Sequence, residues 1–340
     1  MRRRDFIAVV GGAVAMLPLS VRAQRATMPV VGFLNGASPE LYKKFLREFR
    51  RGLNEMGFVE GQNVVVEYRW AENHYERLPE LAADLIRRQV TVIAATSTPA
   101  ALVAKAATTK IPIVFTTASD PVALGFVASL ARPAGNMTGA TQLNMELGPK
   151  RLELMRQLLP NAASIALVVN PANPRVTEVQ IRDAQEAVRA LGLQLQILQA
   201  STPAEFDKIV ASLSQRSIGL VIAGGDSFFL SESALLAAAT VRHAVPTVFL
   251  GREFAAAGGL MSYGGSVADS YHLAGIYTGR ILTGEKPGDL PVHRSSKVEM
   301  YSPAGAGDRR RRSLRIVRPH NSEHASGIWQ GTRACDWIAQ

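Results

Sequence analysis

The chain has 340 residues, 47% of them hydrophobic, and is therefore long enough to bury two ordinary hydrophobic cores. The formal net charge is +10, but most of this excess lies at the two ends, within residues 1–23 and 301–340. A nucleic-acid-binding protein places its basic residues on a folded face, because neutralising phosphates supplies much of its affinity. We therefore expect no nucleic-acid partner.

The first 23 residues have the form of an export signal. Arg3-Arg4-Asp5-Phe6-Ile7 is similar to the twin-arginine motif, and the apolar run from Phe6 to Leu19 is too short to cross a membrane. Val21-Arg22-Ala23 provides a cleavage site, so we expect a periplasmic protein that is cleaved after Ala23. The alternative is a buried N-terminal helix. The single cysteine, Cys335, lies far from this site, which argues against a lipid anchor there and excludes an intrachain disulfide.

Predicted strands and helices alternate through the body of the chain. The first half has strands at 30–34, 64–68, 91–95 and 111–115, helices at 39–57, 76–88 and 99–107, and a segment at 137–141 after a turn-rich passage. The second half has helices at 147–159, 175–191, 203–214, 231–243 and 266–283, strands at 164–169, 193–198, 219–223 and 245–249, and a segment at 260–263. In helix 39–57, Ser38 is the candidate N-cap, and the predicted apolar positions are Leu41, Phe45, Phe49, Leu53 and Met56. This alternation predicts α/β architecture with doubly wound parallel sheets.

Three pairs of segments recur in the same order at nearly constant spacing. They are 30–35 with 165–170, 92–95 with 221–224, and the proline-opened strands 111–115 and 245–249. The repetition predicts two like lobes joined by a hinge. The first spans residues 28–143 with a return of 264–300, and the second spans 144–263. Ligands of such sheets bind beyond the carboxyl ends of the strands, so we expect one cleft between the lobes.

Several motifs together resemble a known family. These are Val-Val-Gly-Phe-Leu at 30–34, Asp-Pro-Val-Ala-Leu-Gly-Phe-Val at 120–127 and Arg-Pro-Ala-Gly-Asn-Met-Thr-Gly at 132–139. Over about residues 28–300 the chain is similar to the ABC-transporter substrate-binding proteins of the tryptophan-binding (TrpX-like) group. The resemblance implies a type I periplasmic binding protein fold that closes on a small, often amino-acid-like ligand and delivers it to a membrane permease. We expect a monomer with no cofactor and no enzymatic activity.

The resemblance also implies a ligand site, carried over by position. It would be lined by Asn35, Thr96, Ser97, Thr98, Thr117, Ser119 and Asp120 from the first lobe, and by Asn170, Asp226 and Tyr263 from the second lobe and hinge. Thr96-Ser97-Thr98 lies between a strand and a helix, where hydroxyls and helix amides can hold a carboxylate. The alternative is that these residues only cap the helix.

Two carboxylates are candidate partners for a ligand ammonium group, because a charge in a cleft needs a cation or several donors. They are Asp120 and Asp226. Asp120 has an alternative role as a turn residue before Pro121. Arg252 is a candidate clamp for a carboxylate, or else a solvated loop arginine.

An enzyme is the competing class. Gly225-Asp226-Ser227 resembles the serine block of Gly-Asp-Ser hydrolases, and Asp269 and His272 have their Asp-x-x-His spacing. In those enzymes the serine follows the first strand of the domain, whereas Ser227 follows a late one, so we favour a binding protein. A sugar-sensing transcription regulator would open with a helix-turn-helix instead of an export signal. The histidines show no metal-ligand spacing except His320 and His324.

The chain departs from the family pattern after Met300. Residues 301–340 are arginine-rich and show no sustained periodicity, so we expect a disordered tail. A reading-frame change would explain this segment, and a genuine divergent tail is the alternative.

The predicted export signal can be tested by sequencing the N-terminus of exported protein, which we expect to begin at Gln24. Replacing Arg3 and Arg4 by lysine should block export, because the twin-arginine pair is the part of the signal that is recognised. Export of that variant at the normal level would contradict the twin-arginine assignment, and a cytoplasmic product that retains Met1 would contradict export altogether.

Overall fold

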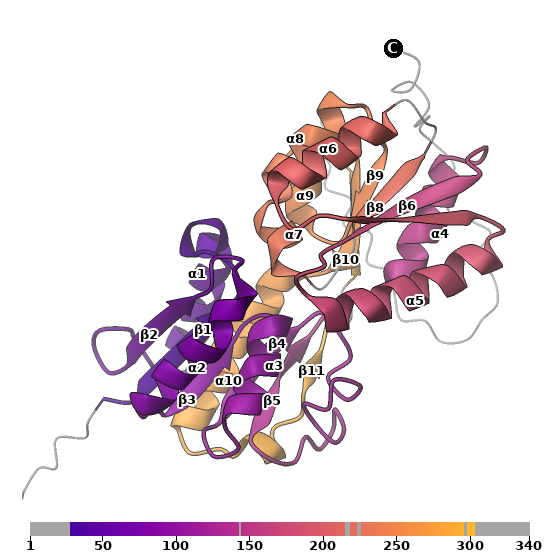
Figure 1. Ribbon diagram of the computed structural model, residues 1–340. Helices are drawn as coiled ribbons and strands as arrows, with labels where there is room; N and C mark the ends of the chain where they lie inside the picture. The colour runs from indigo at the N-terminus through magenta and orange to yellow at the C-terminus, as the bar shows by residue number, and fades with distance from the viewer. Residues whose placement is uncertain (1–27, 143, 215–217, 223–225, 296–297, 303–340) are drawn as a thin grey trace, which may run out of the picture.

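The computed structural model describes residues 28–142, 144–214, 218–222, 226–295 and 298–302. The predicted signal peptide and all but two residues of the predicted tail lie outside these ranges. The described chain forms two lobes, each built on a six-stranded sheet with helices on both faces (Figure 1). This confirms the predicted two-lobed α/β fold. No helix among the described residues has the length and apolar character of a membrane span.

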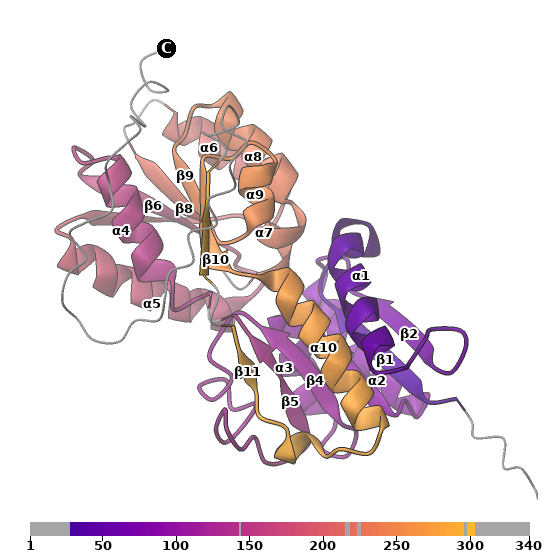
Figure 2. The same ribbon diagram turned by 180° about the vertical axis from the view of Figure 1, so that it is seen from behind.

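The sheet of the first lobe has the order β11-β5-β4-β3-β1-β2, and its neighbouring strands are all parallel. Its strands are β1 (Val30–Asn35), β2 (Val65–Trp70), β3 (Val92–Ala95), β4 (Ile113–Thr117), β5 (Met137–Thr141) and β11 (His293–Arg294). Helices α1 (Pro39–Glu55) and α10 (Val267–Leu282) cover one face (Figure 2). Helices α2 (Leu78–Arg87) and α3 (Thr98–Ala107) cover the other, and two short 3-10 helices span Tyr75–Arg77 and Pro287–Asp289.

The sheet of the second lobe has the order β12-β10-β9-β8-β6-β7. Its strands are β6 (Ser164–Val169), β7 (Gln194–Gln199), β8 (Gly219–Ile222), β9 (Thr247–Phe249), β10 (Met261–Gly265) and β12 (Val298–Tyr301). Its helices are α4 (Gly148–Leu158), α5 (Pro174–Ala190), α6 (Pro203–Leu213), α7 (Ser227–Ser231), α8 (Ser233–Arg242) and α9 (Arg252–Ala256). The segments paired by the sequence repeat form corresponding strands: β1 with β6, β3 with β8, and β4 with β9.

The order of the described elements takes the chain from one lobe to the other three times. The chain leaves the first lobe after β5, returns between β10 and α10, and crosses again between β11 and β12. The last crossing differs from our expectation, in which residues up to 300 stay in the first lobe. Strand β12 pairs antiparallel with β10, with Tyr301 opposite Ser262, because β10 would otherwise expose an unpaired edge. The second lobe therefore includes Tyr301, which we had assigned to the tail.

Helix α1 buries Phe45, Phe49 and Leu53 as predicted, but the prediction was wrong for its first turn. Tyr42 is 2% exposed, whereas Leu41, predicted to be buried, is 41% exposed. Ser38 is the N-cap residue, but its side chain makes no capping hydrogen bond. The five-residue helices α7 and α9 are too short to show a helical period, and the helix predicted from residue 231 is interrupted at Glu232.

Helices α1 and α10 approach closely because glycines lie where they cross. A Cβ atom on Gly275 would lie 2.0 Å from the Phe49 carbonyl oxygen, and one on Gly52 would lie 2.0 Å from the His272 carbonyl oxygen. These backbone atoms belong to helices and cannot move aside without separating the pair. The absence of two side chains therefore allows α10, from late in the sequence, to pack against α1.

We expect Gly275→Ala to lower the free energy of unfolding by about 1–3 kcal/mol, the usual cost of overpacking. Alanine otherwise favours a helix interior by about 1 kcal/mol over glycine, so a net loss identifies the helix contact as its cause. Gly148→Ala is the matched control, because a Cβ atom added to Gly148 at the start of α4 would have no neighbour within 4 Å. Urea denaturation measures both, and equal stability of the two variants would contradict the close-packing account.

Candidate functional site

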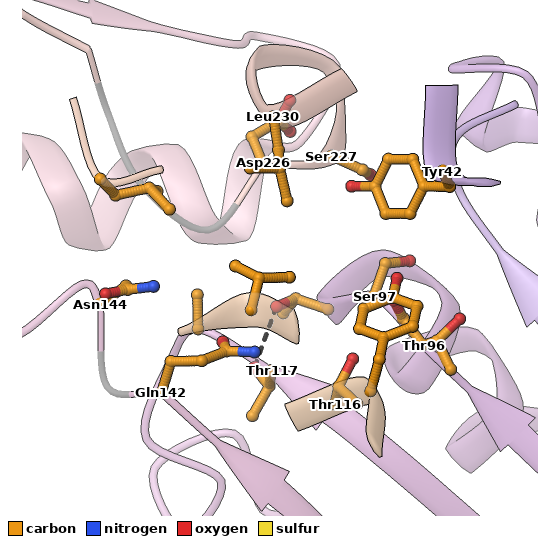
Figure 3. Close-up of a pocket in the computed structure, with 15 residues that line it drawn as sticks. Tyr42, Thr96, Ser97, Thr116, Thr117, Gln142, Asn144, Asp226, Ser227 and Leu230 are labelled. Atoms are coloured by element: carbon orange, nitrogen blue, oxygen red, sulfur yellow. Dashed lines mark hydrogen bonds between the residues drawn. The ribbon is translucent and has the colours of Figure 1, made fainter. Parts of the chain in front are cut away.

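A pocket lies between the lobes, at the carboxyl ends of the strands. It encloses about 410 Å³ of empty space, part of it open to solvent. Figure 3 shows Asp226, Ser227 and Leu230 on one side and Thr96, Ser97, Thr116 and Thr117 on the other. The lining residues are Tyr42, Thr96, Ser97, Thr98, Thr116, Thr117, Ala118, Gln142, Asn144, Asp226, Ser227, Leu230, Leu250, Val267 and Tyr271.

Asn35 lies beneath this pocket and supports its floor. Its side chain is fully buried, and its Nδ2 lies 2.8 Å from the Thr96 hydroxyl and 2.8 Å from the Tyr271 hydroxyl. The Tyr271 hydroxyl in turn donates to the Thr96 carbonyl oxygen. This network ties α10 to the ends of β1 and β3. Asn35 therefore holds two lining residues in place and does not itself line the pocket.

The start of α3 offers fewer free amides than the sequence suggested. The Ser97 hydroxyl accepts from the Ala100 amide at 3.3 Å, and the Ser97 carbonyl accepts from the Ala101 amide at 2.9 Å. The amides that lack an intrahelical acceptor are those of the N-cap residue and the first three helical residues, 97–100. Pro99 has no N–H, so the Ser97 and Thr98 amides are left without a hydrogen-bond partner among the described residues. The Thr98 hydroxyl lies 2.9 Å from the Thr117 hydroxyl. Ser97 thus caps the helix, and the polar groups at this edge of the pocket include the Thr98 amide and the hydroxyl pair.

The residues after β4 divide between the pocket and its surroundings. Thr117 lines the pocket and accepts from the Ser119 amide at 3.1 Å. Ser119 is buried outside it, with its hydroxyl against the Met145 sulfur. Asp120 is exposed and accepts from the Val122 amide at 2.8 Å, as in an Asx turn. Asp120 therefore lies away from the pocket and forms the turn that we had given as its alternative role.

The buried carboxylate of Asp226 accepts hydrogen bonds from several surrounding donors. Asn170 Nδ2 donates to Oδ1 at 3.0 Å, Asn173 Nδ2 donates to Oδ2 at 3.2 Å, and the Phe228 amide donates to Oδ1 at 3.0 Å. The Tyr75 hydroxyl lies 3.2 Å from both oxygens. Burial raises the pKa of Asp226 above its usual value, although these hydrogen bonds act in the opposite direction. Asn170 orients Asp226 from outside the pocket.

Tyr75 belongs to the first lobe, so its contact with Asp226 joins the two lobes. Its hydroxyl also lies 3.0 Å from the Ser227 hydroxyl. A Cβ atom on Gly36 would lie 2.9 Å from the Ser227 Oγ, so this glycine allows the lobes to meet. Lys44 Nζ and Glu253 Oε1, 3.2 Å apart, form an ion pair across the same gap. The structure therefore shows a closed arrangement of the lobes.

Several lining residues were not predicted from sequence. Tyr42 and Tyr271 line one end of the pocket, and their ring centroids lie 6.0 Å apart. The helical spacing of Tyr42 with Phe45 and Phe49 was a usable signal, but Tyr42 had been left out of the apolar face. Gln142 and Asn144 lie in the crossing after β5, where no periodic pattern marks them.

Two further sequence candidates, Tyr263 and Arg252, also lie outside the lining. Tyr263 contributes its carbonyl oxygen to the hinge, where it accepts from Arg151 Nη1 at 3.0 Å. The Arg252 guanidinium stacks over the Tyr301 ring at 5.2 Å from its centroid. Neither contact involves the pocket.

The described residues do not form a hydrolase triad. Ser227 has the Tyr75 hydroxyl as its neighbour, whereas His272 Nε2 lies 2.8 Å from Glu55 Oε2 on the α1 side of α10. No hydrogen bond joins Ser227 to His272 in the described part of the chain. Within the same residues, no group of three or more histidine, cysteine, aspartate or glutamate side chains could hold a metal ion.

The described chain thus forms two like α/β lobes that are closed around a pocket between them. Residues 30–302 match the family model described as ABC transporter substrate binding protein, and the chain belongs to this family. The family consists of solute-binding proteins, not enzymes, and a curated relative is the tyrosine-binding protein of Clostridioides difficile (strain R20291). The two are 25% identical over 258 residues, which cover 76% of this chain and 73% of the relative.

Solved structures share the fold. An ABC domain from Streptococcus pneumonia in complex with L-Trp has a TM-score of 0.69 at 20% identity, covering 80% of this chain and 90% of that one. A conserved domain protein from Vibrio cholerae has a TM-score of 0.70 at 24% identity, covering 81% and 92%. The ligand-free, open structure of a substrate binding protein with adhesive properties from Clostridium difficile has a TM-score of 0.56 at 24% identity, covering 80% and 91%. These likenesses confirm the type I periplasmic binding protein fold.

We expect Tyr75→Phe to favour the open arrangement, because it removes the hydroxyl that bridges the lobes. Hydrogen bonds to charged groups contribute about 1.5–3 kcal/mol, so the closed-to-open ratio should fall roughly tenfold or more. Small-angle X-ray scattering should then give a larger radius of gyration than for the wild type.

Tyr68→Phe is the matched control for this experiment. Its hydroxyl bonds with Arg50 and Glu60 inside the first lobe, away from the lobe contact. An unchanged radius of gyration for Tyr75→Phe, or the same increase in both variants, would contradict a bridging role for Tyr75.

Proposed function

We propose that this ABC transporter substrate-binding protein binds an α-amino acid with an apolar or aromatic side chain in the pocket between its lobes. One observation carries the proposal: a cluster of hydroxyl and amide donors faces a buried carboxylate across the same pocket. An amino acid has the complementary pair of charges. The ligands of two similar proteins, tyrosine and L-Trp, support the same class.

The ligand carboxylate is assigned to Thr98 and Thr117. Their two hydroxyls lie 2.9 Å apart, so one hydroxyl hydrogen joins the pair and the other remains available to donate. Thr117 already accepts from the Ser119 amide, which fixes its oxygen in position. The free Thr98 amide opens α3, where the helix dipole also favours negative charge.

The ligand ammonium group is assigned to the vicinity of Asp226. This carboxylate already accepts several hydrogen bonds, so a ligand cation would add its charge or take the place of the Tyr75 hydroxyl. Burial disfavours the ionised carboxylate, and a nearby cation offsets that cost. Asp120 has no part in this assignment, because it lies in the exposed turn.

The remaining lining suits an apolar side chain. Leu230, Leu250 and Val267 line the pocket together with the rings of Tyr42 and Tyr271. Aromatic rings in such a wall favour tilted or edge contacts with another ring. Gln142 and Asn144 add amide groups at the hinge end, where a polar substituent of the ligand can form hydrogen bonds.

Membership of the family implies a periplasmic or extracellular receptor and a permease partner in the membrane. We further propose that the mature protein begins after Ala23 and acts as a monomer. These two points rest on the sequence of the export segment and on the resemblance to the family.

Calorimetry with L-tyrosine and L-tryptophan tests the assigned carboxylate site. We expect Thr98→Val to weaken binding roughly tenfold or more, because hydrogen bonds to a charged group contribute about 1.5–3 kcal/mol. Thr98→Ser is the control: it retains the hydroxyl and should bind nearly as tightly as the wild type. Equal affinities for L-tyrosine and L-tyrosinamide would remove the carboxylate from the assignment. If neither amino acid binds, the proposed ligand class is wrong.

A further inference from the structure

A second pocket lies within the second lobe, away from the pocket between the lobes. It is formed between α4 and α5 and the ends of strands β6 and β8, and it encloses about 360 Å³ of empty space, part of it open to solvent. Its apolar walls include Leu152, Leu167 and Ile222. The ligand proposed above would bind between the lobes and not in this second pocket. The polar groups that line the second pocket therefore need a separate explanation.

Arg151 is the first of these groups. Its side chain is 1% exposed, and it contacts the two chain segments that enter the hinge. Nη1 donates to the Tyr263 carbonyl at 3.0 Å, and Nη2 donates to the Asn144 carbonyl at 2.6 Å. No carboxylate among the described residues forms an ion pair with this guanidinium, and its Nε has no hydrogen-bond partner there. Burial without a compensating negative charge lowers the pKa of Arg151 to about 10.

Gln180 is the second group. It projects from α5 into the same pocket, and its Nε2 is also buried without a hydrogen-bond partner among the described residues. Asp183, one turn further along α5, lies at the pocket but pairs with the neighbouring Arg182 at 3.2 Å. Two unsatisfied donors from two helices therefore share one pocket. A lone buried donor costs stability, and two in one place are expected to share an acceptor.

We propose that this pocket binds a small monovalent anion, a halide or a short-chain carboxylate, between Arg151 Nε and Gln180 Nε2. An anion satisfies both donors at once and neutralises the buried guanidinium, which two carbonyl oxygens cannot do. Because Arg151 also holds the Asn144 and Tyr263 carbonyls, the bound anion stabilises the side of the hinge that belongs to the second lobe.

Bromide provides a direct test of the site. Crystals soaked in sodium bromide should show an anomalous peak in the pocket, within hydrogen-bonding distance of Arg151 and Gln180. Crystals soaked in sodium formate should show planar density at the same place if the site also accepts carboxylates. Density for water alone in both soaks would overturn the proposal.

Thermal unfolding tests the same site in solution. At constant ionic strength, exchanging gluconate for chloride should raise the unfolding midpoint of the wild type by about 2 °C or more if chloride is well above its dissociation constant. Gln180→Met keeps the side-chain length but removes one donor, and should lose most of this shift. Gln157→Met is the matched control, because Gln157 is exposed on α4 and, among the described residues, its side chain bonds only with Glu153.

An equal chloride response in Gln180→Met and in the control would contradict binding at this pocket. Binding of L-tyrosine or L-tryptophan by Gln180→Met is measured alongside. The anion site and the amino-acid site are separate, so failure of either proposal leaves the other testable.

Discussion

The buried carboxylate of Asp226 is the group on which the closed arrangement of this protein depends. A carboxylate removed from water is costly unless donors surround it, and here the donors come from both lobes. Asn170 and Asn173 reach it from the second lobe, and Tyr75 reaches it from the first. The same contact positions the start of α7, and so sets Ser227 and Leu230 against the pocket. Opening the lobes therefore means giving up the Tyr75 hydrogen bond at a charged group.

The floor of the pocket depends on a second long-range contact. Helix α10 comes late in the sequence but packs in the first lobe, where Gly52 and Gly275 let it approach α1. It then supplies Tyr271, whose hydroxyl lies 2.8 Å from Asn35 Nδ2 across 236 residues of chain. The pocket thus combines the early strands with a late helix, and a change in the helix packing would displace the residues that hold Thr96.

Sequence reasoning located the polar ends of the strands but could not separate lining residues from supporting ones. Thr96, Ser97, Thr98, Thr117 and Asp226 line the pocket as predicted, although their binding role remains a proposal. Asn35 and Asn170 support neighbouring residues from below, and Ser119 is buried elsewhere. All these residue types favour strand ends and turns, because their side chains bond with nearby backbone. The residue type therefore predicts that the residue lies at a strand end. It does not predict whether the side chain points into the pocket or toward neighbouring residues.

The alternation of apolar strands and amphipathic helices determined the two-lobed fold, because burial of one face per element leaves a periodic record in the sequence. The repeat of strand segments likewise identified the corresponding strands of the two sheets. Tertiary structure alone decided which side chains meet across the gap. Tyr42, Tyr75 and Gly36 lie far from Ser227 in sequence, and only the closed lobes bring them together. A local sequence pattern indicates which side chains are buried. A site between the lobes depends on the orientation of one lobe relative to the other, which no single segment of the sequence specifies.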